Sequence, residues 1–443
     1  MSFVLLGLCS FDDVAVREPP MKKIMIYCQH LAGMGHLVRC REITQALVAD
    51  FDVCFVCGGQ AVPQFQLPDG VEMVYLPALL QKGDQIVPMD EDYSLVTIKE
   101  KRKATLLETF ERFQPDCLIT ECFPFSKLSM KDELTPLLEE AKSVNRSVRV
   151  VCSVRDLIMT QPLPEGVRER REAKVQRLIN RFYDALLIHA DLSFQQLEDC
   201  FSSVSSLKCE IVYTGYVAQP LPRPQSVGDQ ILALNDQSSE DANSHLAHPD
   251  IEGPYWSPSI VASAGGGRHG YPLLSAVIAA SHLIMERFAH HIYVFAGPFM
   301  PEEDFCQLQQ VAGDNPNVTL RRYTSRLLDY LNQADLSISL GGYNTTMNLL
   351  STGVRSLLLP SLNPSQTDEQ RIRGEKLASM GVVNLLSAED LHPERLTGAI
   401  TSAMSQQPVP HGINLQGAMS TAAYLKSLLL EESTLMQPEA VAV

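Results

Sequence analysis

The feature that most constrains the fold is an alternation of short apolar runs with longer amphipathic segments, which occurs twice along the chain. The first series begins at residues 23–28 (KIMIYC), and the second begins at residues 259–264 (SIVASA). Short apolar runs separated by amphipathic helices predict parallel strands with helices on both faces of the sheet. We therefore expect an α/β protein with two doubly wound, Rossmann-like domains.

The boundaries of these domains follow from length and local composition. A chain of 443 residues is long enough for about two domains of 150–200 residues each. Residues 219–258 are dominated by Pro, Ser, Asp and Asn, which is typical of a linker or an exposed insertion. We expect an N-terminal domain over 21–218 and a C-terminal domain over 259–410. Residues 1–20 are expected to form a disordered extension, and 411–443 a C-terminal helix and tail.

The composition of the chain excludes some classes of binding partner. The net charge of -16 makes nucleic acid an unfavourable partner, because such a surface repels a phosphate backbone. No apolar run reaches the roughly 18–20 residues that span a bilayer. The 11 cysteines are scattered, and the lone CxxC pair, Cys54 and Cys57, lies in a strand-like run. These features predict reduced thiols in a cytoplasmic protein without a metal site.

The first candidate functional loop contains Gly33, Gly35 and His36 and follows the run at 23–28. Ligands of open parallel sheets bind beyond the carboxyl ends of the strands, where this loop is expected. Val38 stands where a dinucleotide fingerprint requires its third glycine, so that class is disfavoured. A histidine, with an ordinary pKa of about 6.5, suits a general base near neutral pH. A capping or purely structural histidine is the alternative.

Two more glycine loops follow strand-like runs in the second half of the chain. Free backbone N–H groups at a helix start form a site for phosphate, and a neighbouring arginine adds a charge-assisted hydrogen bond. The alternative is a pair of flexible turns. The candidate phosphate ligands are Gly265, Gly266, Gly267 and Arg268 in the second loop, and Gly342, Asn344 and Thr345 in the third.

A polar group further along, Asp368, Glu369 and Gln370, is expected at another junction between a strand and a helix. Carboxylate and amide side chains there could hydrogen-bond to sugar hydroxyls. Alternatively, the two acidic residues are only favourable charges at a helix start.

The motifs GMGH, GGGR, GGYNT and TDEQ together resemble those of the GT-B glycosyltransferases. The resemblance is greatest to predicted glycosyltransferases related to the peptidoglycan N-acetylglucosaminyltransferase, in a family 28-like group, and covers about 21–400 without the insertion at 225–258. It implies an inverting, metal-independent hexosyltransferase that uses a nucleoside-diphosphate sugar, expected to be UDP-linked, and no further cofactor. The acceptor would be a small molecule or a lipid-linked molecule, which is compatible with peripheral membrane contact.

The resemblance also implies roles for individual residues. His36 would deprotonate the acceptor hydroxyl, with Gly33 and Gly35 in the acceptor loop. Glu121 would orient His36, unless it is a solvated loop acid, and Asp156 is a weaker candidate for that role. The phosphate loops would hold the donor diphosphate, residues 368–370 would contact the donor sugar, and Tyr323 and Thr324 would meet the base.

Two positions depart from the related motifs, and other functions stay open. Asn348 stands where related donor motifs carry a glutamate for the ribose, and Leu340 stands where plant-type enzymes have histidine. Hydrolysis of a nucleotide sugar, with His36 activating water, is one alternative, because GMGHxxRC also occurs in nucleotide-sugar hydrolases. A non-catalytic nucleotide-sugar-binding protein is another, and an epimerase is less favoured. Every version of this prediction needs Gly267 and Asn344 on the same side of their sheet, with His36 facing the gap between the domains.

Overall fold

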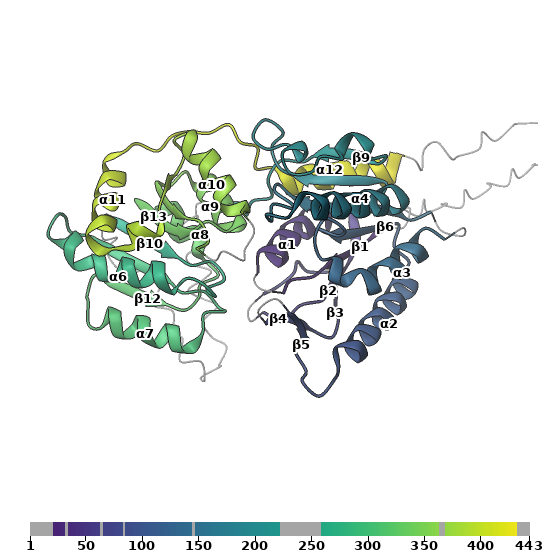
Figure 1. Ribbon diagram of the computed structural model, residues 1–443, viewed down its shortest axis with the longest axis horizontal. Helices are drawn as coiled ribbons and strands as arrows, with labels where there is room; N and C mark the ends of the chain where they lie inside the picture. The colour runs from purple at the N-terminus through teal and green to yellow at the C-terminus, as the bar shows by residue number, and fades with distance from the viewer. Residues whose placement is uncertain are drawn as a thin grey trace, which may run out of the picture.

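The computed structural model describes residues 21–31, 34–62, 65–82, 85–143, 147–221, 258–362 and 368–431. These residues form two α/β domains side by side (Figure 1), each with one parallel sheet between layers of helices. The predicted fold class is therefore confirmed. The expected extension at 1–20, the end of the tail and nearly all of the expected insertion lie outside the described residues.

The N-terminal sheet has seven parallel strands in the order β3-β2-β1-β6-β7-β8-β9. Strand β1 lies inside the sheet. From it the chain first adds β2 and β3 on one side and then β6 to β9 on the other, as in other doubly wound sheets. The strands are β1 (Lys22–Cys28), β2 (Phe51–Cys57), β3 (Glu72–Tyr75), β6 (Cys117–Glu121), β7 (Arg149–Arg155), β8 (Ala185–His189) and β9 (Glu210–Tyr213). The helices are α1 (Gly35–Leu47), α2 (Leu95–Phe113), α3 (Lys131–Ala141) and α4 (Glu165–Phe182), and a hairpin of β4 (Leu79–Lys82) and β5 (Gln85–Pro88) lies outside the sheet.

Strand β1 shows why its sequence is apolar throughout. Ile24 and Ile26 belong to the hydrophobic cluster that contains the inner faces of α1 and α12, whereas Met25 and Tyr27 belong to the cluster under α2 and α3. Successive side chains point to opposite faces of a sheet, and both faces are covered here. A central strand of this kind therefore requires a continuous apolar run.

The C-terminal sheet has six parallel strands in the order β12-β11-β10-β13-β14-β15. The strands are β10 (Ser259–Ser263), β11 (His291–Phe295), β12 (Val318–Arg321), β13 (Leu336–Leu340), β14 (Ser356–Leu359) and β15 (Asn384–Leu385). The helices are α6 (Tyr271–Met285), α7 (Glu302–Ala312), α8 (Leu327–Gln333), α9 (Tyr343–Thr352), α10 (Glu369–Ser379) and α11 (Pro393–Ser405). The hairpin β4–β5, strand β9 and helix α11 are absent from the sequence prediction.

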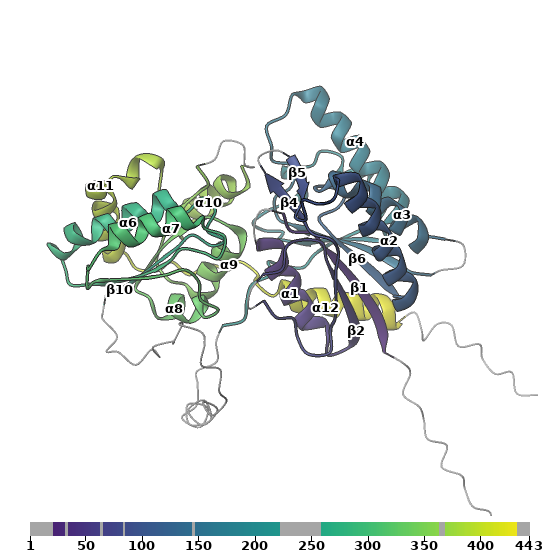
Figure 2. The same ribbon diagram turned by 90° about the horizontal axis from the view of Figure 1, so that it is seen from below.

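The last helix, α12 (Gly417–Lys426), returns to the N-terminal domain and lies along α1 (Figure 2). Ala422 and Leu425 enter the same apolar cluster as Ile43 of α1, and Lys426 forms an ion pair with Asp50 at 2.5 Å. The C-terminal helix expected within 411–443 therefore lies at Gly417–Lys426, and it packs on the first domain. Among the described residues, no helix combines the length and hydrophobicity needed to cross a membrane.

The cysteines of the described residues are free thiols, and all of them are buried except Cys209 and Cys306. The unpaired state of these buried thiols agrees with the prediction that the cysteines are reduced.

Candidate active site

A cavity of about 990 Å³ lies between the two domains, at the carboxyl ends of β1, β10 and β13. Gly267, Asn344 and His36 all line it, so the spatial requirement of the sequence prediction is met. The predicted site residues on its wall are Gly35, His36, Gly265, Gly266, Gly267, Arg268, Tyr323, Thr324, Gly342, Asn344, Thr345, Glu369 and Gln370. Gly33 lies outside the described residues, and Glu121 sits behind His36 rather than on the wall.

The second glycine loop, after β10, is a packed turn. Gly267 has a φ of +96°, and a Cβ at this position would lie 2.5 Å from the carbonyl oxygen of Ala296. Only glycine fits there without moving the neighbouring loop. The N–H of Phe299 donates to the Gly266 carbonyl at 2.9 Å, which fixes the loop from the other side. The loop is therefore packed on both sides, which favours a fixed conformation over the alternative of a flexible turn.

The second and third glycine loops meet. A Cβ at Gly265 would lie only 3.4 Å from Oγ1 of Thr345. Helices α6 and α9 start at these loops, with Gly270 and Gly342 as N-caps, without a side-chain cap and without an acidic residue in the first turn. Uncapped helix starts present N–H groups and a partial positive charge, which suit an anion. The two starts face one cavity, where a diphosphate could bind both.

Arg268 adds a positive group to this wall. Its Nε is buried and has no hydrogen-bond partner among the described residues, and its guanidinium carbon lies 5.9 Å from the ring centroid of Phe299. A guanidinium with unused donors beside two helix starts is suited to bind phosphate oxygens.

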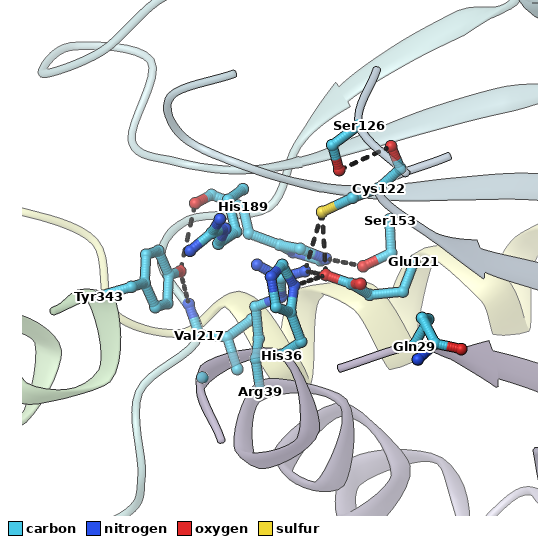
Figure 3. A network of polar contacts seen from close by, with 12 residues as sticks. Gln29, His36, Arg39, Glu121, Cys122, Ser126, Ser153, His189, Val217 and Tyr343 are labelled. Atoms are coloured by element: carbon cyan, nitrogen blue, oxygen red, sulfur yellow. Dashed lines mark hydrogen bonds and ion pairs between the residues drawn. The ribbon is translucent and has the colours of Figure 1, made fainter. Parts of the chain in front are cut away.

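His36 and Glu121 form a close pair across the end of the first sheet (Figure 3). Nδ1 of His36 lies 2.5 Å from Oε1 of Glu121. The Glu121 carboxylate is buried, whereas the His36 side chain keeps 21% of its exposure. Because a carboxylate only accepts hydrogen bonds, we assign the proton to Nδ1, which leaves Nε2 free to accept a proton.

Glu121 is held by two more cations, since Arg39 and Lys127 both form ion pairs with its carboxylate. Burial alone would raise the pKa of Glu121, but His36, Lys127 and Arg39 hold this pKa well below its usual range. The alternative that Glu121 is a solvated loop acid is therefore wrong. It is the last residue of β6, and its environment keeps it ionised.

The same environment keeps His36 neutral. Burial, which disfavours the charged imidazolium, lowers the pKa of His36 to about 3, and the positive charges of Lys127 and Arg155 act in the same direction. Glu121 opposes this shift. At neutral pH the imidazole is therefore unprotonated, as a general base must be.

A second buried histidine, His189, lies behind this pair (Figure 3). Its Nε2 lies 2.7 Å from Ser153 Oγ, and its Nδ1 lies 2.8 Å from Thr214 Oγ1. Both ring nitrogens are occupied, and burial lowers its pKa well below the usual range. His189 therefore has a structural role.

The residues predicted to contact the donor sugar separate in space. Glu369 lines the cavity and forms an ion pair with Arg155 of the other domain at 3.0 Å. Gln370 also lines it and accepts a hydrogen bond from the Ser361 N–H at 3.0 Å. Asp368 is not part of the cavity wall, and its partly exposed carboxylate faces Arg371 at 3.3 Å.

Asp156 does not contact His36. Its buried carboxylate accepts two hydrogen bonds from Arg373 of α10, at 2.7 and 2.9 Å. It therefore joins the two domains, and the suggestion that it assists the histidine is wrong on geometric grounds.

Asn348 occupies the position where related motifs have glutamate. Its Nδ2 donates to Gln219 Oε1 at 3.1 Å, and its buried Oδ1 has no partner among the described residues. Since Asn348 lines the cavity one helical turn beyond Asn344, this oxygen is available to accept a hydrogen bond from a hydroxyl of a ligand. Leu340 also lines the cavity, at the end of β13.

In the part of the chain that the structure describes, one group of ligating atoms is close enough to bind a metal ion. Nitrogen, oxygen and sulfur atoms of His36, Glu121 and Cys122 lie within 4.8 Å of one another. However, the Glu121 carboxylate already has Arg39 and Lys127 as partners. Two cations at the central ligand oppose the binding of a third, so these residues do not fit a metal site.

Sequence reasoning missed the arginine and lysine residues around this pair. Arg39 lies three residues after His36 in GMGHLVRC, and positions i and i+3 share one face of a helix. That spacing is a signal for Arg39. Lys127 lies in the turn after β6, and Arg155 is the last residue of β7. Both are therefore at the sheet edge where ligands bind, and this position is the signal for both.

Two facing Rossmann-like domains with a cavity between their strand ends, together with a C-terminal helix that returns to the first domain, define the GT-B fold. Comparisons with known proteins agree. Residues 262–423 match the family model of the glycosyltransferase family 28 C-terminal domain, which confirms the resemblance to family 28-like GT-B glycosyltransferases.

A curated relative is the UDP-N-acetylglucosamine--N-acetylmuramyl-(pentapeptide) pyrophosphoryl-undecaprenol N-acetylglucosamine transferase of Bacillus licheniformis, 25% identical over 144 residues. The match spans 32% of this chain and 38% of that enzyme, so the chain covers well under half the length of this relative.

Two solved structures show the fold over nearly the whole chain. The glycotransferase of kitacinnamycin has a TM-score of 0.55 at 15% identity and covers 93% of this chain and 100% of that one. A Listeria monocytogenes protein described as a UDP-N-acetylglucosamine 2-epimerase has a TM-score of 0.57 at 13% identity and covers 96% of this chain and 100% of that one. These similarities establish the architecture and leave the reaction to be argued from the site.

Proposed function

We propose that this protein is a glycosyltransferase that moves a sugar from a nucleoside-diphosphate sugar, UDP-linked, to an acceptor hydroxyl, with inversion and without a metal ion. One observation carries the proposal. His36, whose Nδ1 pairs with Glu121, lines the same cavity as two uncapped helix starts and Arg268, whose buried Nε has no hydrogen-bond partner among the described residues. The match to the family 28 C-terminal domain supports the same reaction class.

In this reaction Nε2 of His36 accepts the proton of the acceptor hydroxyl as the acceptor oxygen attacks the anomeric carbon. The bond from that carbon to the diphosphate oxygen breaks, and its electron pair leaves with the nucleoside diphosphate. Glu121 stabilises the imidazolium that forms, in the manner of the acid in a catalytic triad. Because attack and departure occur on opposite sides of the carbon, its configuration inverts.

Fixed dipoles and a positive side chain would stabilise the negative charge of the leaving group. The N–H groups at the starts of α6 and α9 and the guanidinium of Arg268 would bind the diphosphate. Asn348 would accept a hydrogen bond from a ribose hydroxyl, and Tyr323 and Thr324 would contact the nucleobase of the donor. Glu369 and Gln370 would contact the sugar, whereas Asp368 lies off the cavity wall.

A product assay tests this proposal. The protein is first screened by thermal shift against UDP-, dTDP- and GDP-sugars, because a bound donor raises the melting temperature by mass action. The stabilising donor is then incubated with candidate small-molecule and lipid-linked acceptors, and the products are identified by mass spectrometry. The proposal predicts a glycosylated acceptor of inverted configuration, formed equally in the presence of EDTA.

The same assay separates the alternatives. Free sugar formed at full rate without any acceptor would identify a hydrolase in which His36 activates water. Binding of the donor without turnover, unchanged by His36→Ala, would identify a non-catalytic binding protein.

A further inference from the structure

Three buried guanidinium nitrogens in the domain interface lack a hydrogen-bond partner among the described residues. They are Nε and Nη1 of Arg39 and Nη1 of Arg373. Both arginines are 1% exposed, so water does not reach these atoms freely. Unpaired donors on a buried cation are costly, and another interaction must compensate for them.

The ring of Tyr343 provides that interaction. The guanidinium carbon of Arg39 lies 5.8 Å from the ring centroid, and that of Arg373 lies 5.3 Å from it. The negative face of an aromatic ring attracts a cation within about 6 Å, most strongly where water is excluded. Tyr343 is itself buried, so its ring offers both guanidinium groups a cation–π contact in a place that excludes water.

The two arginines form ion pairs in different parts of the site. Arg39 belongs to α1 and forms an ion pair with Glu121, the partner of His36. Arg373 belongs to α10 and forms the buried pair with Asp156 of the other domain. Tyr343 is the first residue of α9, directly before Asn344 and Thr345. One side chain therefore contacts the cations that organise the histidine pair and the domain interface.

We propose that Tyr343 is a positioning residue whose ring face holds Arg39 on Glu121 and thereby fixes the His36–Glu121 pair relative to the donor-binding start of α9. This inference rests on the proposed function for the roles of His36 and α9. The phenol oxygen has a separate task, since it accepts from the Val217 N–H at 3.2 Å and donates to the His189 carbonyl at 3.4 Å.

The test measures the His36 imidazole by NMR in the full-length protein without substrate. In Tyr343→Leu, Arg39 loses its ring contact and leaves Glu121, so the carboxylate charge acts more strongly on His36. The pKa of His36 should then rise by about one to three pKa units. Tyr343→Phe keeps the ring face and should titrate like the wild type.

Other charged groups around His36 also influence its pKa. Glu121 and Lys127 face it from β6 and the following turn, Arg155 faces it from β7, and Arg39 lies on its own helix. Glu369 of α10 acts on this group through Arg155. Arg39→Met should therefore raise the pKa of His36 as Tyr343→Leu does. The double variant, with both substitutions, should show the same pKa of His36 as Arg39→Met alone.

A matched control separates positioning from general stability. Tyr330→Leu removes another packed ring of the C-terminal domain, which contacts Tyr293 and Phe295 rings at 5.2 and 4.9 Å. It should lower the melting temperature without moving the titration of His36. If Tyr343→Leu does not fold, Tyr343→Met fills the site with a flexible apolar side chain and serves as the second variant.

The proposal is overturned if a folded Tyr343→Leu or Tyr343→Met protein titrates like the wild type, or if Tyr343→Leu shifts the titration further on the Arg39→Met background. Because no substrate is present, these outcomes are independent of turnover. Absence of any transferase activity would instead count against the proposed function.

Discussion

Asn344 of the C-terminal domain donates a hydrogen bond from Nδ2 to the carbonyl oxygen of Gly35 in the N-terminal domain, at 3.3 Å. Gly35 is the first residue of α1 and directly precedes His36. Asn344 is the second residue of α9, where the diphosphate is proposed to bind. The two halves of the proposed site are therefore in direct contact, and the distance from donor to base is set by the start of each helix.

Replacement of His36 tests the proposed base. His36→Ala should lower kcat for sugar transfer by about 100- to 10,000-fold, the usual contribution of a positioned general base. The Kd of UDP, measured by calorimetry, should stay within about twofold, since the diphosphate ligands belong to the other domain. A large loss of UDP affinity would show that His36 binds the donor instead.

Replacement of Glu121 should affect both stability and rate. Glu121→Gln removes the carboxylate that Arg39 and Lys127 share, and breaking a buried ion pair in this way costs about 3–5 kcal/mol. Chemical denaturation should show this loss in the free energy of unfolding. The folded fraction should also turn over more slowly than the wild type, because His36 loses the partner that stabilises its protonated form.

The interdomain pair of Asp156 and Arg373 can be examined by a double-mutant cycle. Asp156→Ala leaves the Arg373 guanidinium buried without a carboxylate, and Arg373→Leu leaves the opposite charge, so each should destabilise by about 3–5 kcal/mol. The double variant should be clearly more stable than the sum of the two losses predicts. Simple additivity in the denaturation curves would contradict a direct buried pair.

The pH dependence of stability follows from the low pKa of His36. Its pKa is about 3 in the folded protein and about 6.5 in the unfolded chain, so between these values the unfolded chain binds more protons. Stability should therefore fall as pH decreases from about 6.5, by up to about 1.4 kcal/mol per pH unit from this group.

His36→Asn serves as the control for this dependence, because His30, with a pKa lowered by burial to about 4, contributes in the same direction in both proteins. The free energy of unfolding of His36→Asn should vary less steeply between pH 6.5 and 4 than that of the wild type. Equal slopes for the two proteins would mean that His36 is protonated in the folded state.

Much of the fold could be predicted because buried parallel strands leave a strong local signal. The run KIMIYC is apolar since β1 is covered on both faces. Strand β9 and the hairpin β4–β5 are short and only partly buried, so their residues carry no such pattern. Helix α12 was predicted as a helix, but its packing on α1 depends on residues far away in the sequence.

The site could be predicted only where its residues lie in one motif. The glycine loops are local features, and they converge as expected. The burial of Glu121 could not be inferred, because one of its cations, Arg39, lies 82 residues away in the sequence. The pair of Arg155 and Glu369 is separated by 214 residues. Charge compensation over such separations is a property of the tertiary structure alone.

The central claim is that a nucleoside diphosphate binds between the starts of α6 and α9 with its phosphates on Arg268. Calorimetric titration of UDP tests it, with Arg322→Ala as the control, since Arg322 pairs with Glu302 outside the cavity. We predict that UDP binds to the wild type and to Arg322→Ala alike, and about 10- to 100-fold more weakly to Arg268→Ala, as expected for a lost charge-assisted hydrogen bond. The absence of binding to the wild type by UDP, dTDP and GDP, or an Arg268→Ala affinity equal to that of the wild type, would contradict the claim.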